Sequence, residues 1–96
     1  MSDNPVAIVT GGSRGVGAAT AKMLSENGWN VIITCSSSID EAKKVAKSCS
    51  NKSSQVLALQ ADVSKNSDCI ATINTAIGQW NRIDALVNNA GTTKFV

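Results

Sequence analysis

A glycine-rich segment at residues 10–17, Thr-Gly-Gly-Ser-Arg-Gly-Val-Gly, follows directly on an apolar run at residues 6–9. When an apolar strand breaks into glycines and then enters a helical pattern, backbone N–H groups and a helix N-terminus come close to a phosphate. A side chain at Gly11, Gly15 or Gly17 would hold that phosphate away or require an unfavourable φ. We therefore expect an α/β fold whose first strand-to-helix turn binds a nucleotide.

Strand and helix patterns alternate along the rest of the chain. Apolar and β-branched runs predict strands over residues 5–10, 31–35, 55–61 and 83–87. Strands that are apolar on both faces and alternate with helices imply a parallel sheet covered by helices. Right-handed crossovers then favour the strand order 3-2-1-4, the first half of a Rossmann-type doubly wound sheet.

Three helices are predicted between these strands from the helical spacing of apolar residues. We expect Asn27 and Gly28 to close the first helix, and Ser38 with Glu41 to form a capping box that opens the second. The polar residues 50–54 predict a loop. The expected inward faces are Val16, Ala19, Met23 and Leu24 in the first helix, Ala42, Val45, Ala46 and Cys49 in the second, and Ile70, Ile73, Ile77 and Trp80 in the third.

Composition excludes several classes of function. The sequence holds no histidine, which removes Ser-His-Asp catalysis and histidine-ligated metal sites. The net charge of +2 gives no support for nucleic acid or membrane binding, and no apolar run approaches the length of a membrane span. The N-terminus has no signal-peptide pattern, and the three cysteines have no Cys-x-x-Cys spacing, so we expect free thiols in a cytoplasmic protein without a metal site.

Three kinds of phosphate-binding loop have glycine patterns comparable with residues 10–17. A P-loop needs Lys and Ser or Thr after its last glycine, but Ala18 and Ala19 stand there. A Gly-x-Gly-x-x-Gly fingerprint starting at Gly15 would need Gly or Ala at position 20, which is Thr20. The pattern Thr-Gly-x-x-x-Gly-x-Gly fits residues 10–17 completely.

With that pattern, the chain resembles the short-chain dehydrogenase/reductase family. The family's Asn-Asn-Ala-Gly motif stands at residues 88–91, directly after the fourth predicted strand, and a weaker Asp-Val motif stands at residues 62–63 after the third. The resemblance covers essentially the whole chain, and residues 88–94 are similar to β-ketoacyl-carrier-protein reductases. It implies a nicotinamide dinucleotide bound along Gly11, Ser13, Arg14, Gly15, Val16 and Gly17.

The end of the second predicted strand bears on which dinucleotide is bound. An NAD-binding fold usually carries an acid about 20 residues beyond the glycines, for the ribose 2′-hydroxyl. Here Cys35, Ser36 and Ser37 occupy that place, while Asp40 and Glu41 come later and suit the first turn of a helix. Arg14 supplies a fixed positive charge, although it could also be a solvated loop residue. We therefore predict NADP(H).

The resemblance also assigns residues near the other strand ends. Asp62 would accept a hydrogen bond from the adenine amino group, with the Val63 N–H beside it, although Asp62 or Ser64 could instead cap the third helix. Asn88, Ala90 and Gly91 would line the ribose and nicotinamide side. Asn89 could equally hold neighbouring strands, and we interpret Asp84 as structural.

The family's chemistry transfers a hydride between the nicotinamide and a carbonyl or alcohol carbon, with a Tyr-x-x-x-Lys pair as general acid/base. The sequence contains no tyrosine, so we assign no catalytic residue. We expect residues 1–96 to be the N-terminal part of one NADP-binding domain, completed by further chain; a truncated module stays open, as does a non-catalytic NADP sensor. By resemblance we also expect a homo-oligomer, often a tetramer, that acts on a small molecule.

Overall fold

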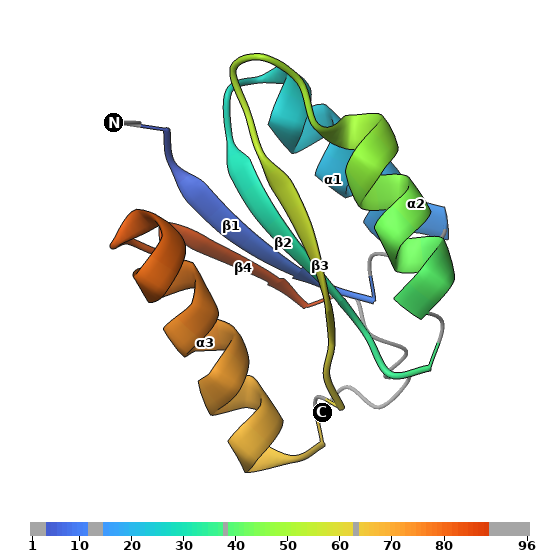
Figure 1. Cartoon of the computed structure of the whole chain (residues 1–96), viewed down its shortest axis with the longest axis vertical. Coiled ribbons are helices and arrows are strands. Elements are labelled where there is room, and N and C mark those ends of the chain that lie inside the picture. The colour runs from blue at the N-terminus through green and yellow to red at the C-terminus, as the bar shows by residue number, and fades with distance from the viewer. Residues whose placement is uncertain (1–3, 12–14, 38, 63, 89–96) are drawn as a thin grey trace.

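Four parallel strands form one sheet with helices on both faces (Figure 1). The computed structural model describes residues 4–11, 15–37, 39–62 and 64–88. Within them the elements are β1 (Val6–Thr10), α1 (Gly15–Glu26), β2 (Asn30–Cys35), α2 (Ile39–Cys49), β3 (Val56–Gln60), α3 (Asn66–Trp80) and β4 (Ala85–Asn88). The sheet order is β3-β2-β1-β4, which confirms the predicted topology and Rossmann-type class.

The two central strands form the core of the molecule. Every residue of β1 and β2 is buried, because each strand has a neighbour on both sides and a helix layer on both faces. In parallel strands, residues in register share a face. Ile8 pairs with Ile32 and Leu86, and Ile32 pairs with Leu57, so these four side chains form one row on the α3 side of the sheet.

The opposite face of the sheet is covered by α1 and α2 (Figure 1). In α2, Ala42, Ala46 and Cys49 are buried and Val45 is partly buried, which confirms the predicted face. The predicted face of α1 is wrong except for Leu24, because Val16 and Met23 are 71% and 54% exposed and Ala19 is also exposed. The buried residues of α1 are Gly17, Ala21 and Ser25, small side chains that let the helix lie close to the sheet.

The face that α3 turns toward the sheet also differs from the prediction. Thr72 and Ala76 are buried there, with Trp80 partly buried, whereas Ile70, Ile73 and Ile77 are 50%, 47% and 42% exposed. The predicted stripe therefore holds at Trp80 and is wrong for the three isoleucines.

The C-terminal end of α1 lies at the predicted stop signal, Gly28. Gly28 has φ +86°, the left-handed conformation that glycine tolerates best, and its N–H donates to Ser25 O at 3.2 Å. The Trp29 N–H donates to Leu24 O at 3.0 Å, so the last carbonyls of the helix are satisfied by a Schellman motif. The capping box at the start of α2 cannot be assessed in the same way, because Ser38 lies outside the described residues.

Asp84 is structural, as its place in the sequence indicated. It precedes β4, and its Oδ2 accepts hydrogen bonds from the Val6 N–H and the Arg82 Nε, both at 2.8 Å. Arg82 Nη2 lies 2.8 Å from Oδ1, so the guanidinium binds the carboxylate through two nitrogens. These bonds, first that of Arg82 and then that of Val6, hold the pKa of Asp84 below its ordinary value. The Asp84 side chain thereby ties the start of β4 to β1.

Candidate nucleotide-binding site

The carboxyl ends of all four strands meet at one edge of the sheet, because the strands are parallel (Figure 1). That edge carries Gly11 after β1, Ser36 and Ser37 after β2, Asp62 after β3 and Asn88 at the end of β4. Ligands of open α/β sheets bind outside the carboxyl ends, at the point where the strand order reverses. In this sheet that point lies between β1 and β4, since β2 and β3 follow on one side of β1 and β4 lies on the other.

The turn between β1 and α1 contains two glycines in the left-handed region. Gly11 has φ +71° and Gly15 has φ +64°, so an L-amino acid at either position would strain the backbone. The Gly11 N–H donates to Thr34 O at 2.9 Å, which ties the start of the turn to β2. Helix α1 begins at Gly15, Val16 is exposed beside it, and Gly17 is buried within the first turn of the helix. Ser13 and Arg14 lie outside the described residues.

The end of β2 presents hydroxyls and backbone groups. Cys35 turns its thiol into the core, where Sγ lies 3.9 Å from Leu59 O, and its own carbonyl accepts the Ala61 N–H at 2.8 Å. Ser36 and Ser37 follow and are exposed. The Gln60 Nε2 donates to Ser36 O at 3.2 Å and so holds this strand end against β3. The described end of β2 thus offers two serine hydroxyls and no carboxylate.

Asp62 lies in a tight turn between β3 and α3. Its Oδ1 accepts the Ser64 hydroxyl at 2.6 Å and the Ser64 N–H at 2.9 Å, and these two bonds, the hydroxyl first, hold the pKa of Asp62 below its ordinary value. The expected alternative, that Asp62 or Ser64 caps α3, is wrong: Lys65 is the N-cap residue, and it makes no side-chain capping bond. The carboxylate therefore remains ionised near neutral pH and half-buried at the sheet edge.

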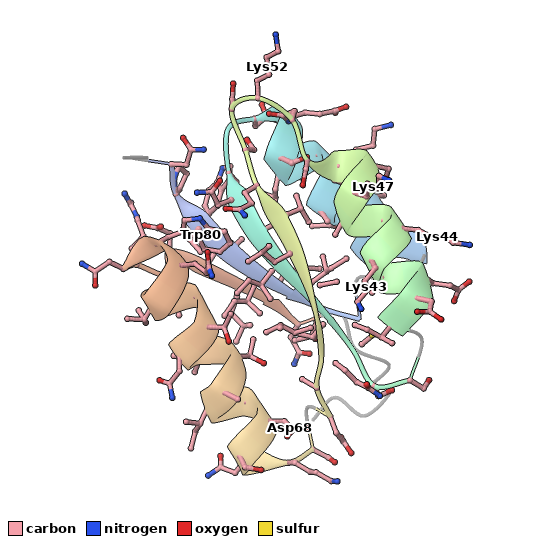
Figure 2. All side chains as sticks on the ribbon, viewed as in Figure 1. Lys43, Lys44, Lys47, Lys52, Asp68 and Trp80 are labelled. Carbon is pink, nitrogen blue, oxygen red and sulfur yellow. The ribbon has the colours of Figure 1, made fainter. Side chains whose placement is uncertain are left out.

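Asp68, in the first turn of α3, is a residue that the sequence reasoning missed. Its Oδ2 accepts the backbone N–H of Asp62 at 2.8 Å, so the first turn of α3 fixes the position of Asp62. Figure 2 shows Asp68 at the start of α3, near the end of β3, while Trp80 lies at the opposite end of the helix. The sequence did contain a signal for this role, because Asp68 is an acidic residue in the first turn of the helix that follows Asp62.

Thr10 is a second residue that was not assigned to the site. Its hydroxyl lies 3.2 Å from Asn88 Oδ1 and 3.3 Å from Val87 O, and so links the ends of β1 and β4. Register places Thr34 next to Thr10 on the same face of the sheet. Thr34 is 2% exposed, and among the described residues its Oγ1 is a buried side-chain oxygen without a hydrogen-bond partner.

The described residues thus bring Gly11, Ser36, Asp62 and Asn88 to one edge. Along that edge the sheet order β3-β2-β1-β4 sets the sequence Asp62, Ser36, Gly11 and Asn88. Val63, Asn89, Ala90 and Gly91 lie outside the described residues. A hollow of about 470 Å³ at the opposite end of the sheet is lined by residues 50–56. In the described parts of the chain no three His, Cys, Asp or Glu side chains are placed to hold a metal, and Cys35, Cys49 and Cys69 are free thiols. No helix among the same residues is both long and apolar enough to cross a membrane.

The sequence profile described as "short chain dehydrogenase" matches residues 5–96, so this chain belongs to the short-chain dehydrogenase/reductase family. One relative is the 3-oxoacyl-[acyl-carrier-protein] reductase of Staphylococcus epidermidis, 40% identical over 91 residues. A solved double mutant of a Serratia marcescens short-chain dehydrogenase/reductase superposes with a TM-score of 0.84 at 37% identity, over 96% of this chain and 38% of that one. The expected family and fold are therefore confirmed.

Relatives of two lengths match this chain. The Staphylococcus reductase is matched over 95% of this chain but only 37% of its own length, so the chain spans little more than a third of such relatives. By contrast, a short-chain dehydrogenase/reductase homolog of Bacillus subtilis is 38% identical over 93 residues, which is 97% of this chain and 85% of that protein.

Proposed function

We propose that the carboxyl edge of the sheet binds NADP(H), and that residues 1–96 are the N-terminal part of a single NADP-binding domain in a carbonyl or alcohol oxidoreductase. The observation that carries the proposal is the turn between β1 and α1. Two left-handed glycines, Gly11 after β1 and Gly15 as the first residue of α1, lie there at the reversal point of a parallel sheet. Family membership supports the same reading, since a nicotinamide cofactor belongs to this kind of enzyme.

The residues at this edge fit a dinucleotide. An ideal Cβ built on Gly15 meets no atom within 4 Å, so the glycine serves the backbone conformation and leaves open space above the turn. The positive end of the α1 dipole favours a diphosphate in that space. Gly11, Ser13, Gly15, Val16 and Gly17 would hold the diphosphate.

The nucleoside ends of the dinucleotide would lie over the other strand ends. The ionised carboxylate of Asp62, with the Val63 N–H beside it, would accept the adenine amino group. Asn88, Ala90 and Gly91 would line the ribose and nicotinamide side, with the Asn88 amide oriented by the Thr10 hydroxyl at 3.2 Å.

The preference for the 2′-phosphate rests on the end of β2. Ser36 and Ser37 offer hydroxyls there, next to Cys35 at the strand end, and none of these three residues is an acid that would repel a phosphate. Arg14 would add a cation whose planar geometry matches a phosphate. One relative is a 3-oxoacyl-carrier-protein reductase, and we propose a carbonyl-containing small molecule as the substrate class here.

The bound nicotinamide would supply hydride transfer, while the residues of this chain bind and orient the dinucleotide. No tyrosine occurs in the 96 residues, so the proton-transferring acid is not among them. The absence of tyrosine, together with the similarly short Bacillus relative, favours a non-catalytic NADP-binding module as the second candidate function. We also propose that the protein is cytoplasmic.

Isothermal titration calorimetry of the purified chain with NADPH, and separately with NADH, tests the proposal. We expect NADPH to bind more tightly, and Arg14→Ala to weaken NADPH binding by about 1.5–3 kcal/mol, the range for a hydrogen bond to a charged group, with little effect on NADH. Lys22→Ala, which removes an exposed cation of α1, is the matched control and should change neither affinity. Equal losses for both cofactors in Arg14→Ala would refute the assigned role of Arg14.

A further inference from the structure

The peptide that follows Ser36 is turned out of the strand pattern at the carboxyl end of β2. In a parallel strand, the carbonyls of successive residues point alternately to the two neighbouring strands. Thr34 O accepts the Gly11 N–H at 2.9 Å, on the β1 side of β2. Cys35 O accepts the Ala61 N–H at 2.8 Å, on the β3 side. A strand that continued in this way would direct Ser36 O toward β1.

Gln60, the last residue of β3, gives this carbonyl a different direction. Its Nε2 donates to Ser36 O at 3.2 Å, so the carbonyl is directed to the β3 side. In a planar trans peptide the N–H points opposite to the C=O, so the Ser37 N–H points away from β3. The strand on that other side of β2 is β1, and Gly11 follows it in the turn of the proposed diphosphate site.

The end of β2 also leaves donors available to a ligand. Within the described part of the chain, the Ser37 N–H and the hydroxyls of Ser36 and Ser37 make no hydrogen bond, and both serines are exposed. Backbone N–H groups turned to one side form sites for anions. Asp40 and Glu41 add negative charge in the first turn of α2, so a phosphate here needs donors that are directed at it.

We propose that Gln60 is a positioning residue for the 2′-phosphate of NADP(H): by holding Ser36 O, it directs the Ser37 N–H toward that phosphate. The inference rests on the proposed NADP(H) site and adds a residue of β3 that acts through the end of β2. Because NADPH and NADH differ by the 2′-phosphate, the effect of Gln60 should be confined to NADPH. Since one hydrogen bond from an exposed side chain contributes little to folding, stability should hardly depend on it.

Isothermal titration calorimetry of the 96-residue protein with NADPH, and separately with NADH, tests this inference in Gln60→Met. Methionine keeps the length of the side chain and removes the donor. We expect the dissociation constant of NADPH to rise about five- to tenfold and that of NADH by less than about twofold, with the same urea midpoint as the wild type. Gln55→Met is the matched control, because Gln55 is an exposed glutamine just before the opposite end of β3, and it should change neither affinity.

Backbone amide NMR during titration with NADP⁺ gives a second readout that does not depend on activity. We expect a large shift of the Ser37 N–H in the wild type and a clearly smaller one in Gln60→Met. The shifts of Gly11 and Gly15 should be retained in both proteins, because these glycines lie in the turn proposed for the diphosphate.

The outcomes separate this inference from the proposed function. A wild type that binds neither dinucleotide would contradict the proposed function and the inference together. A wild type that prefers NADPH, with Gln60→Met binding NADPH equally well, would overturn the inference alone. Equal losses for NADPH and NADH in Gln60→Met would also overturn it, because they would indicate a general distortion of the sheet edge.

Discussion

Three polar groups at the carboxyl edge of the sheet are held by hydrogen bonds, whereas the Thr34 hydroxyl is buried without a described partner. The Thr10 hydroxyl reaches Asn88, the Asp62 carboxylate takes two bonds from Ser64, and the Asp62 N–H is held by Asp68. A site arranged in this way needs little reordering when a ligand binds, and ordering is a main cost of binding.

Thr34→Val tests the energetic cost of the unpartnered hydroxyl. An unsatisfied buried hydroxyl destabilises the folded state by about 1–3 kcal/mol, and valine fills nearly the same volume, so we expect a higher free energy of unfolding in urea. The matched control is Thr72→Val, because Thr72 is also buried but donates to Asp68 O at 2.9 Å. If Thr34→Val lowers stability as much as Thr72→Val does, the Thr34 hydroxyl has a partner in solution.

The lowered pKa of Asp84 predicts a pH dependence. A carboxyl whose pKa is lower in the folded than in the unfolded protein stabilises the fold above its unfolded pKa, and this contribution is lost as the pH falls through the folded pKa. Asp84→Asn should therefore be less stable than the wild type at neutral pH, and the difference should shrink in acid. Thermal unfolding between about pH 6 and pH 2.5 measures it. A constant difference across that range would show that the Asp84 charge does not contribute.

At the scale of elements, the strands could be predicted from the sequence and two of the helix faces could not. The β-branched run in β2 and the apolar run in β1 leave little alternative to buried strands, and short connections then set the topology. The helix predictions placed the largest apolar residues inside. In α1 the close approach to the sheet instead selects Gly17, Ala21 and Ser25, whose i, i+4 spacing was the signal that the prediction overlooked.

Gly28 and Gly78 differ in backbone conformation, so replacing each with alanine should change stability in opposite directions. Gly28→Ala places an alanine at φ +86° and should lower the free energy of unfolding by about 1–2 kcal/mol. Gly78→Ala lies inside α3 with no atom within 4 Å of the new Cβ, and should raise it by about 0.5–1 kcal/mol through helix propensity. Chemical denaturation of both variants checks the signs. Similar effects of the two substitutions would contradict the assigned left-handed conformation of Gly28.

At the scale of the whole molecule, the sequence predicted where the candidate site lies but not how it is held. The glycines, Ser36, Asp62 and Asn88 could be assigned because parallel strands bring their carboxyl ends together. The bonds from Thr10 to Asn88 and from Asp62 to Asp68 depend on side-chain directions that no short pattern encodes. The exposure of Ile70, Ile73 and Ile77 on α3 was also missed, because helical periodicity alone does not say which apolar face turns inward.

The central claim is that the carboxyl edge of this sheet binds a nicotinamide dinucleotide. Backbone amide NMR of the chain during titration with NADP⁺ measures this most directly. We predict saturable shifts at Gly11, Gly15, Ser36, Asp62 and Asn88, with the signals of residues 50–56 at the opposite end of the sheet unchanged. A spectrum that stays the same at saturating NADP⁺, or shifts confined to residues 50–56, would contradict the claim.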